Sequence, residues 1–197
     1  MNERFKCIVA DPPWRYKNTM PVTGNDAGYP GRYERSKTNY ATMTVEKITE
    51  LPVRELADKA GCHLYLWTTK DHLEYSWGIV RAWGFTPKQI LTWCKKPKGM
   101  IGFGTFSGCT EFVMFAVTGK RAIHHNRCNR TWWEWPRGKH SAKPEAFQDI
   151  VESVSPGPYL ELFARRKRLG WSVWGNEVDS DVAITIAENN KRRIVAL

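Results

Sequence analysis

Residues 7–14 read CIVADPPW, a short apolar run followed by an acid, two prolines and a tryptophan. The segment Cys7–Ala10 suits a buried strand, whereas Pro12 and Pro13 lack a backbone N–H and cannot continue strand pairing. The strand is therefore predicted to end at Asp11, where a stiff loop begins. A purely structural interpretation makes this loop a rigid turn that Asp11 caps.

Five further apolar runs suit strands, and most are nearly continuous rather than alternating, as in strands covered on both faces. They are His63–Thr69, Gln89–Lys95, Glu111–Thr118, Tyr159–Arg165 and Trp171–Trp174. Helical patterns lie between several of them: from Val45 after a Thr44 cap, from Pro52 to Lys59, over Leu73–Trp83 and over Pro144–Val154. Strands that alternate with helices predict an α/β fold with a mostly parallel sheet and helices on both faces.

Two long segments, 16–40 and 119–143, interrupt this alternation. The first is polar and contains glycine; the second holds seven basic residues and one acid around the sequence TWWEW. Ligands of α/β sheets bind beyond the carboxyl ends of the strands, where such loops gather. We therefore expect one domain over residues 1–197, with 16–40 as a substrate or gate loop and 119–143 as a nucleic-acid recognition loop.

The amino-acid composition indicates which class of partner the protein binds. The formal net charge is +10, and ten tryptophans contribute to 13% aromatic residues, a combination that favours binding to nucleic acid. The chain has no long uncharged apolar stretch and no signal-peptide pattern, so we expect a cytoplasmic protein that does not enter a membrane. Five scattered cysteines without a CxxC pair predict neither a disulfide framework nor a metal site, although His124, His125 and Cys128 could be read as ligands.

The loop at Asp11 suits the recognition of a flat heterocycle that carries an NH₂ group. The exocyclic amine of adenine is a poor nucleophile because its lone pair is delocalised into the ring. Hydrogen bonds from its two N–H groups to the Asp11 carboxylate and to the Pro12 carbonyl would favour pyramidalisation. Proline fixes the direction of that carbonyl, and Trp14 offers a face for stacking on the base.

This loop and several other segments resemble the MT-A70 family of S-adenosylmethionine-dependent adenine-N6 methyltransferases. After DPPW, the resemblance continues through NYATMT at Asn39–Thr44, HLYLWTT at His63–Thr69, and the glycine-rich loop and strand KPKGMIGFGTFSGCTEFVMFAVTGK. It ends with HSAKPE at His140–Glu145 and with YLELFARR and GWSVWGNE within Tyr159–Glu177. The resemblance implies a Rossmann-like class I methyltransferase fold with permuted motif order, in which the catalytic loop precedes the cofactor strands.

The resemblance also implies roles for individual residues. It places Asp11, Pro12 and Pro13 at the target amine and Trp14 and Tyr40 around the base. Lys143 falls at the junction of substrate and cofactor, in the element that also contains Ser141. Cofactor binding is expected from Asp11, Ser141, Lys143, Glu161, Arg165, Asn176 and Glu177. The family ends its last motif with glutamine where this chain has Glu177, which keeps an acceptor but loses the amide donors.

The combined pattern predicts methyl transfer from S-adenosylmethionine to adenine N6 in DNA. Nucleic acid is expected to contact the second loop, above all Arg127, Arg130, Trp132 and Trp133, while Arg121, Arg137 and Lys139 can also neutralise phosphates and Trp135 can also stack on a base. These tryptophans could instead pack the loop onto the domain or form a dimer contact. RNA is the alternative substrate; a protein amide is another, since related loops hold glutamine side chains. A non-catalytic binding partner is a further alternative, and it would be expected to have lost the DPPW or cofactor motifs. The protein is expected to act as a monomer or homodimer.

Overall fold

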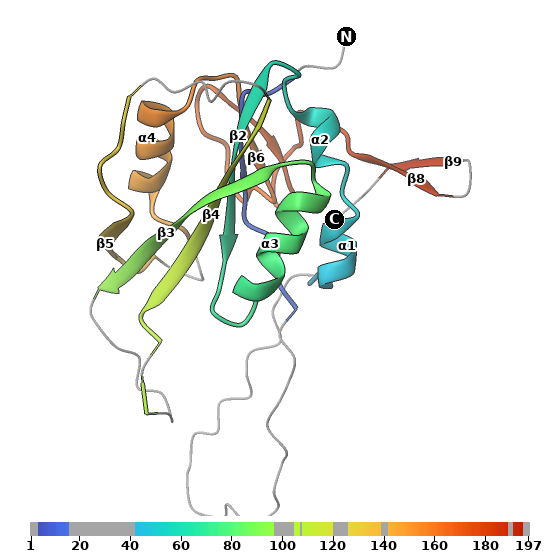
Figure 1. The fold of residues 1–197 in the computed structure, drawn as a ribbon. Coiled ribbons are helices and arrows are strands. Elements are labelled where there is room, and N and C mark those ends of the chain that lie inside the picture. Colours follow the sequence, from blue (N-terminus) through green and yellow to red (C-terminus); the bar gives the residue numbers. More distant parts are fainter. Residues whose placement is uncertain are drawn as a thin grey trace, which may run out of the picture.

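Strands of one mixed sheet form the centre of the molecule (Figure 1). The computed structural model describes residues 4–15, 42–96, 105–106, 108–119, 126–138, 142–188 and 191–194. Within these residues, seven strands pair in the order β5-β3-β4-β2-β1-β6-β7. Their bounds are β1 Cys7–Ala10, β2 Gly61–Thr68, β3 Thr86–Lys96, β4 Thr110–Gly119, β5 Trp132–Pro136, β6 Tyr159–Leu162 and β7 Trp171–Trp174.

Strand β1 lies between two parallel neighbours that are far from it in sequence. Ala10 pairs with Leu66 of β2 on one side and with Leu162 of β6 on the other. The pairs β6–β7 and β3–β5 are also parallel, whereas β4 runs antiparallel to β2 and β3. These pairings confirm the predicted mostly parallel α/β sheet.

Helices cover both faces of the sheet, as the sequence predicts. On one face, α1 (Val45–Thr49), α2 (Val53–Leu56) and α3 (Leu73–Ala82) pack against a core that includes Ile8, Leu64 and Leu66. On the other, α4 (Glu145–Val154) packs Phe147 and Val151 against a core that includes Val9, Tyr65 and Trp67. Successive side chains of β1 and β2 point to opposite faces of the sheet, so the two strands contribute to two separate hydrophobic cores.

The predicted helix ends agree closely with the structure. The hydroxyl of Thr44 accepts a hydrogen bond from the Lys47 N–H at the start of α1. After α3, Gly84 has φ +76°, a conformation that glycine adopts without strain. Helix α2 ends at Leu56, earlier than the predicted Lys59, because Ala57 adopts an extended conformation and bridges to Phe5 beside β1.

Two parts of the structure differ from the sequence interpretation. The segment TWWEW, assigned to an irregular loop, contributes strand β5, which extends the sheet beside β3. Aromatic residues favour pleated structure, and here an edge position was available for them. A hairpin of β8 (Thr185–Glu188) and β9 (Lys191–Ile194) was also not foreseen. The predicted loop 16–40 lies outside the described residues.

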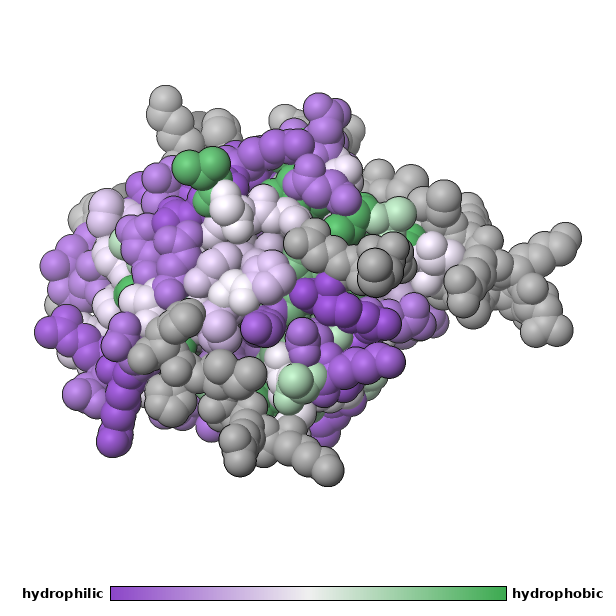
Figure 2. Space-filling model, turned by 90° about the horizontal axis from the view of Figure 1, so that it is seen from above, coloured by the Kyte–Doolittle hydropathy of each residue, from purple (hydrophilic) through white to green (hydrophobic). Residues whose placement is uncertain are grey.

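The carboxyl ends of β1 and β2 meet at the lower side of the molecule in Figure 1. The opposite end, seen in Figure 2, is largely hydrophilic, with only small apolar areas among the residues that are coloured. No helix in the described part of the chain combines the length and apolar character that crossing a membrane requires.

Candidate active site

A cavity of about 480 Å³ lies where β1 and β6 end, between these strands and the start of α4. Asp11 follows β1 directly, and its backbone N–H donates to the Leu162 carbonyl at 3.4 Å. Since Val9 pairs with Glu161, the parallel register brings Asp11 and Glu161 to the same end of the sheet. Both carboxyl groups line the cavity, although 150 positions separate them in the sequence.

Backbone hydrogen bonds fix the loop that follows Asp11. The Trp14 N–H donates to the Pro12 carbonyl at 2.8 Å, and the Met43 N–H donates to the Pro13 carbonyl at 2.8 Å. The Arg15 N–H in turn donates to the Met43 carbonyl at 3.2 Å. A carbonyl oxygen has two acceptor positions, so Pro12 keeps one for a further donor. The loop is therefore stiffened by contacts outside the prolines themselves.

Trp14 belongs to the hydrophobic core and is not among the residues that line the cavity. Its side chain is 5% exposed, and its indole N–H donates to the Trp67 carbonyl at 3.2 Å. One face of the ring stacks on His72, with centroids 4.8 Å apart. The arrangement anchors the loop to the sheet, while the expected contact of Trp14 with a base stays a prediction.

Side chains of alternating charge form a row that begins at Asp11 beside the cavity. The Lys143 ammonium lies 3.0 Å from Asp11 Oδ1 and 3.2 Å from Glu111 Oε2, and Lys95 pairs with the other oxygen of Glu111. The same ammonium lies 5.4 Å from the centroid of the Trp67 ring. Lys143 is thus held between two carboxylates and an aromatic face, and Glu111 is a site residue that the sequence analysis missed.

The pKa values in this row of side chains reflect burial opposed by ion pairing. Burial raises the pKa of Asp11, and the nearby Lys143 opposes that rise. Burial also acts to raise the pKa of Glu111, but Lys143 and Lys95 together hold it below its ordinary value. For Lys143, burial favours the neutral form, yet Asp11 and Glu111 raise its pKa, which keeps the ammonium charged.

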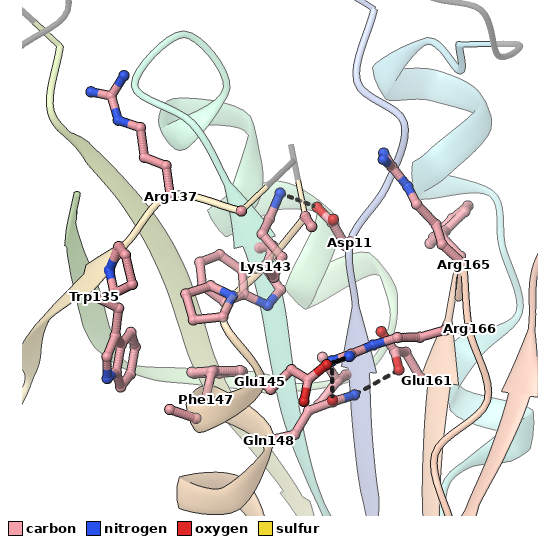
Figure 3. A pocket seen from close by; sticks show the side chains of 18 residues that line it. Asp11, Trp135, Arg137, Lys143, Glu145, Phe147, Gln148, Glu161, Arg165 and Arg166 are labelled. Atoms are coloured by element: carbon pink, nitrogen blue, oxygen red, sulfur yellow. Dashed lines mark hydrogen bonds and ion pairs between the residues drawn. The ribbon is translucent and has the colours of Figure 1, made fainter. Parts of the chain in front are cut away.

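A second network occupies the β6 side of the cavity (Figure 3). The Gln148 amide of α4 donates to Glu161 Oε2 at 2.7 Å, and its oxygen accepts from Arg166 Nη2 at 3.2 Å. Arg166 also pairs with Glu145 at the start of α4. Burial, with the Asp11 charge as a smaller contribution, raises the pKa of Glu161 to about 7. Gln148 was also missed, because only the fold shows that α4 lies beside Glu161.

The remaining residues that are expected to bind the cofactor and that the structure describes lie after β6 and β7. Arg165 lines the cavity, and its Nε lies 3.7 Å from Glu177 Oε1. Gly175 makes this proximity possible, because a Cβ there would lie 2.1 Å from the Ala164 carbonyl oxygen. The backbones after the two strands therefore touch, which places Asn176 and Glu177 beside the loop that holds Arg165.

Four of the residues expected to bind nucleic acid, Arg127, Arg130, Trp132 and Trp133, lie before and within β5 and are not among the residues that line the cavity. Arg127 and Arg130 are exposed, and Trp132 is 58% exposed. Trp133 stacks on Trp135 with centroids 5.6 Å apart and an interplanar angle of 5°. Trp135 and Arg137, which the sequence also suggested as nucleic-acid contacts, do line the cavity. Tyr40 and Ser141 lie outside the described residues.

Comparison with known proteins finds a match to both sides of this cavity. A model of the MT-A70 family matches residues 5–177. Type II methyltransferase M.MunI of a Mycoplasma species is 31% identical over 185 residues, which cover 89% of this chain and 78% of that protein. The human N(6)-adenine-specific methyltransferase METTL4 is 26% identical over 195 residues, 88% of this chain and 37% of METTL4. The matched residues run from the strand before Asp11 to Glu177.

Proposed function

Because the chain belongs to the MT-A70 family, we propose that it transfers a methyl group from S-adenosylmethionine to the N6 amine of adenine in DNA. The observation that carries the proposal is the placement of Asp11. Its carboxylate lies at the end of a central strand, on a loop fixed by backbone hydrogen bonds, and lines a cavity that Glu161 of the neighbouring strand β6 also lines. Acceptor and cofactor residues thus meet in one place.

Asp11 is suited to hold an amine during the reaction. Lys143 binds Oδ1, so the second carboxylate oxygen can accept a hydrogen bond from one N–H of the adenine amine. The Pro12 carbonyl accepts from the other N–H. Such fixed acceptors stabilise the positive charge that develops on nitrogen as the N–C bond forms. S-adenosylmethionine would supply the electrophilic methyl carbon, so that the S–CH₃ bond breaks as the N–C bond forms and S-adenosylhomocysteine leaves. The amine would then release a proton to solvent to give the neutral N6-methyl product.

The residues along β6, β7 and α4 fit the cofactor. Pro144, the N-cap of α4, makes no side-chain capping hydrogen bond, and the first turn of the helix lines the cavity. Free backbone N–H groups at a helix start bind carboxylates well, and Lys143 lies beside them. Glu161 and Glu177 are suitable acceptors for the amino and hydroxyl groups of such a ligand. We assign the cofactor to this half of the cavity.

The preference for DNA over RNA rests on similarity rather than on a side chain that would read a ribose 2′-OH. The chain is similar to the Type II methyltransferase M.MunI, of which the match covers 78%. It also aligns with the N(6)-adenosine-methyltransferase MT-A70-like protein of Drosophila melanogaster, 25% identical over 189 residues, 89% of this chain and 27% of that protein. RNA is therefore the second candidate. Action in the cytoplasm, as a monomer or homodimer, belongs to the same proposal.

The test is methyl transfer from labelled S-adenosylmethionine to single-stranded DNA, duplex DNA and RNA of matched sequence, followed by nucleoside analysis. The proposal predicts N6-methyldeoxyadenosine as the product. Product formed only in RNA would overturn the choice of DNA. Cofactor binding without transfer to any nucleic acid would favour the non-catalytic partner, and label in a protein would favour amide methylation.

A further inference from the structure

Arg137 follows Trp133 and Trp135 at every second position of the chain, at the edge of the sheet beside the cavity. Strand pairing continues past β5, because the Arg137 N–H donates to the Lys96 carbonyl at 3.1 Å. Side chains alternate along a strand, so Arg137 lies on the same face as the stacked Trp133 and Trp135. Both Trp135 and Arg137 line the cavity. The backbone of this residue is therefore fixed, and its side chain belongs to the site.

One edge of the Arg137 guanidinium is buried without a partner. Within the described part of the chain, neither Nε nor Nη2 has a hydrogen-bond partner, and both atoms are shielded from solvent. These two nitrogens direct their N–H groups from the same edge of the planar group, which is the edge that binds two oxygens of a carboxylate or phosphate side by side. Leaving such charged donors unsatisfied is costly, so a bound oxyanion would explain their placement.

The other cations that line the cavity already have anionic partners. Lys143 lies between Asp11 and Glu111, Arg165 is near Glu177, and Arg166 pairs with Glu145. Among the cationic side chains that line the cavity in the described residues, only Arg137 has no such partner. The Nε and Nη2 N–H groups of Arg137 therefore form a fork of donors in the cavity that is in place to bind an incoming anion.

We infer that Arg137 binds the backbone phosphate adjacent to the target adenine. This inference rests on the proposed function, which places the adenine amine at Asp11. Arg137 and Arg165 lie on opposite sides of the Asp11–Lys143 pair in Figure 3. The Arg165 side belongs to β6 and the cofactor, whereas Arg137 follows β5 at the other edge of the sheet. When a base of the strand is held at Asp11, the anion available to Arg137 in the same cavity is a backbone phosphate next to that base.

The role differs from general attraction of a polyanion. Exposed arginines such as Arg127 and Arg130 neutralise phosphates wherever the strand passes, and they carry no information about which nucleotide is bound. A buried fork beside the cavity instead fixes one phosphate relative to one base. Arg137 is therefore a positioning residue that sets the register of the strand on the enzyme.

The experiment is a double-mutant cycle that combines an Arg137 variant with an oligonucleotide in which one phosphate has been made neutral. Binding of a short single-stranded oligodeoxynucleotide with one adenine is measured by fluorescence anisotropy for wild type, Arg137→Ala and Arg137→Lys. The oligonucleotide is prepared with natural linkages, with a methylphosphonate adjacent to the adenine, or with a methylphosphonate several nucleotides away. Arg81→Ala is the control, since Arg81 is exposed on α3 and lies over Trp77. Calorimetry with S-adenosylmethionine and thermal unfolding are run on every variant.

We expect Arg137→Ala to weaken binding about tenfold to a hundredfold, the range for hydrogen bonds to a charged group. Wild type should lose a similar factor when the adjacent linkage is neutral, and Arg137→Ala should then lose little more. Arg137→Lys should recover only part of the affinity, because it keeps charge without the fork. Arg81→Ala should bind as wild type does.

Equal sensitivity of wild type and Arg137→Ala to the adjacent methylphosphonate would overturn the inference. So would a loss of cofactor affinity with unchanged oligonucleotide binding, which would assign the fork to the cofactor carboxylate. A fall in melting temperature without the coupling would make Arg137 structural. Anisotropy does not require turnover, so coupling in a protein that transfers no methyl group would retain the inference and reject the proposed reaction.

Discussion

Two regions are organised in opposite ways: the floor of the cavity, with Asp11, Gln148 and Glu161, and the exposed segment 126–130 before β5, here called the outer rim. On the floor, Asp11, Glu161 and Gln148 each contact a partner from another element, and the pairs are largely buried. On the outer rim, Arg127 and Arg130 are exposed. Catalysis requires groups that are held in place before the substrate arrives. Binding of a polyanion instead requires charged side chains that can adjust to the positions of the phosphates. Substitutions on the floor should therefore change stability or rate strongly, and those on the outer rim should act weakly through salt.

The largest effect is expected for Trp14→Ala. The indole is buried between His72 and the core, so its removal should lower the free energy of unfolding by about 3–5 kcal/mol. Urea denaturation measures this loss. Trp77→Ala, at a position exposed on α3, is the matched control. A Trp14→Ala protein of normal stability but weak oligonucleotide binding would instead make Trp14 a platform for the base.

The next effect concerns Asp11→Asn, which keeps the shape of the side chain but removes its charge. Methyl transfer should slow by at least about a hundredfold, because the amide cannot offer the same acceptor to the amine. Single-turnover assays measure the rate, and calorimetry should show that the cofactor still binds. Asp71→Asn serves as control, since Asp71 is exposed and pairs with the exposed Lys70. Near normal turnover would remove Asp11 from the mechanism.

A smaller effect should follow from the pKa of Glu161, which burial raises to about 7. Ligand contacts that need the carboxylate are present above this value and are lost as pH falls through it. Cofactor affinity should therefore decrease by up to about tenfold per pH unit below 7. Calorimetry across this range checks the slope. In Glu161→Gln the slope should disappear, and an identical slope in that variant would assign the titration to another group.

The smallest effect is expected on the outer rim. Replacing Arg127 and Arg130 with Ala should flatten the dependence of log affinity on log salt by roughly 0.7 to 0.9 per lost phosphate contact. Cofactor affinity should not change. Anisotropy titrations at several salt concentrations provide the measurement. An unchanged salt slope, accompanied by a lower melting temperature or a different oligomeric mass, would give the segment a structural role.

The sequence predicted those features that depend on neighbours along the chain. Apolar runs, the Thr44 cap and the DPPW motif are local signals, and the family model confirms the resemblance that the motifs suggested. Glu111 and Gln148 carried no such signal, because their roles arise only when β4 and α4 pack beside Lys143 and Glu161. For Trp14 the motif indicated a stacking face but not that tertiary packing also buries the ring, and its contact with a base stays a prediction. Strand β5 was missed because its partner, β3, is distant in sequence.

The position of β1 between β2 and β6 has a consequence for synthesis of the chain. β2 can pair with β1 once Thr68 has been made, but β6 begins at Tyr159 and closes the other edge much later. Until then a fully buried strand of the finished protein has one open edge, which is a site for pairing with another chain. The loop at Asp11 therefore reaches its final surroundings only after β6 has been made, and a chain that stops before Tyr159 is expected to aggregate because one edge of β1 stays open.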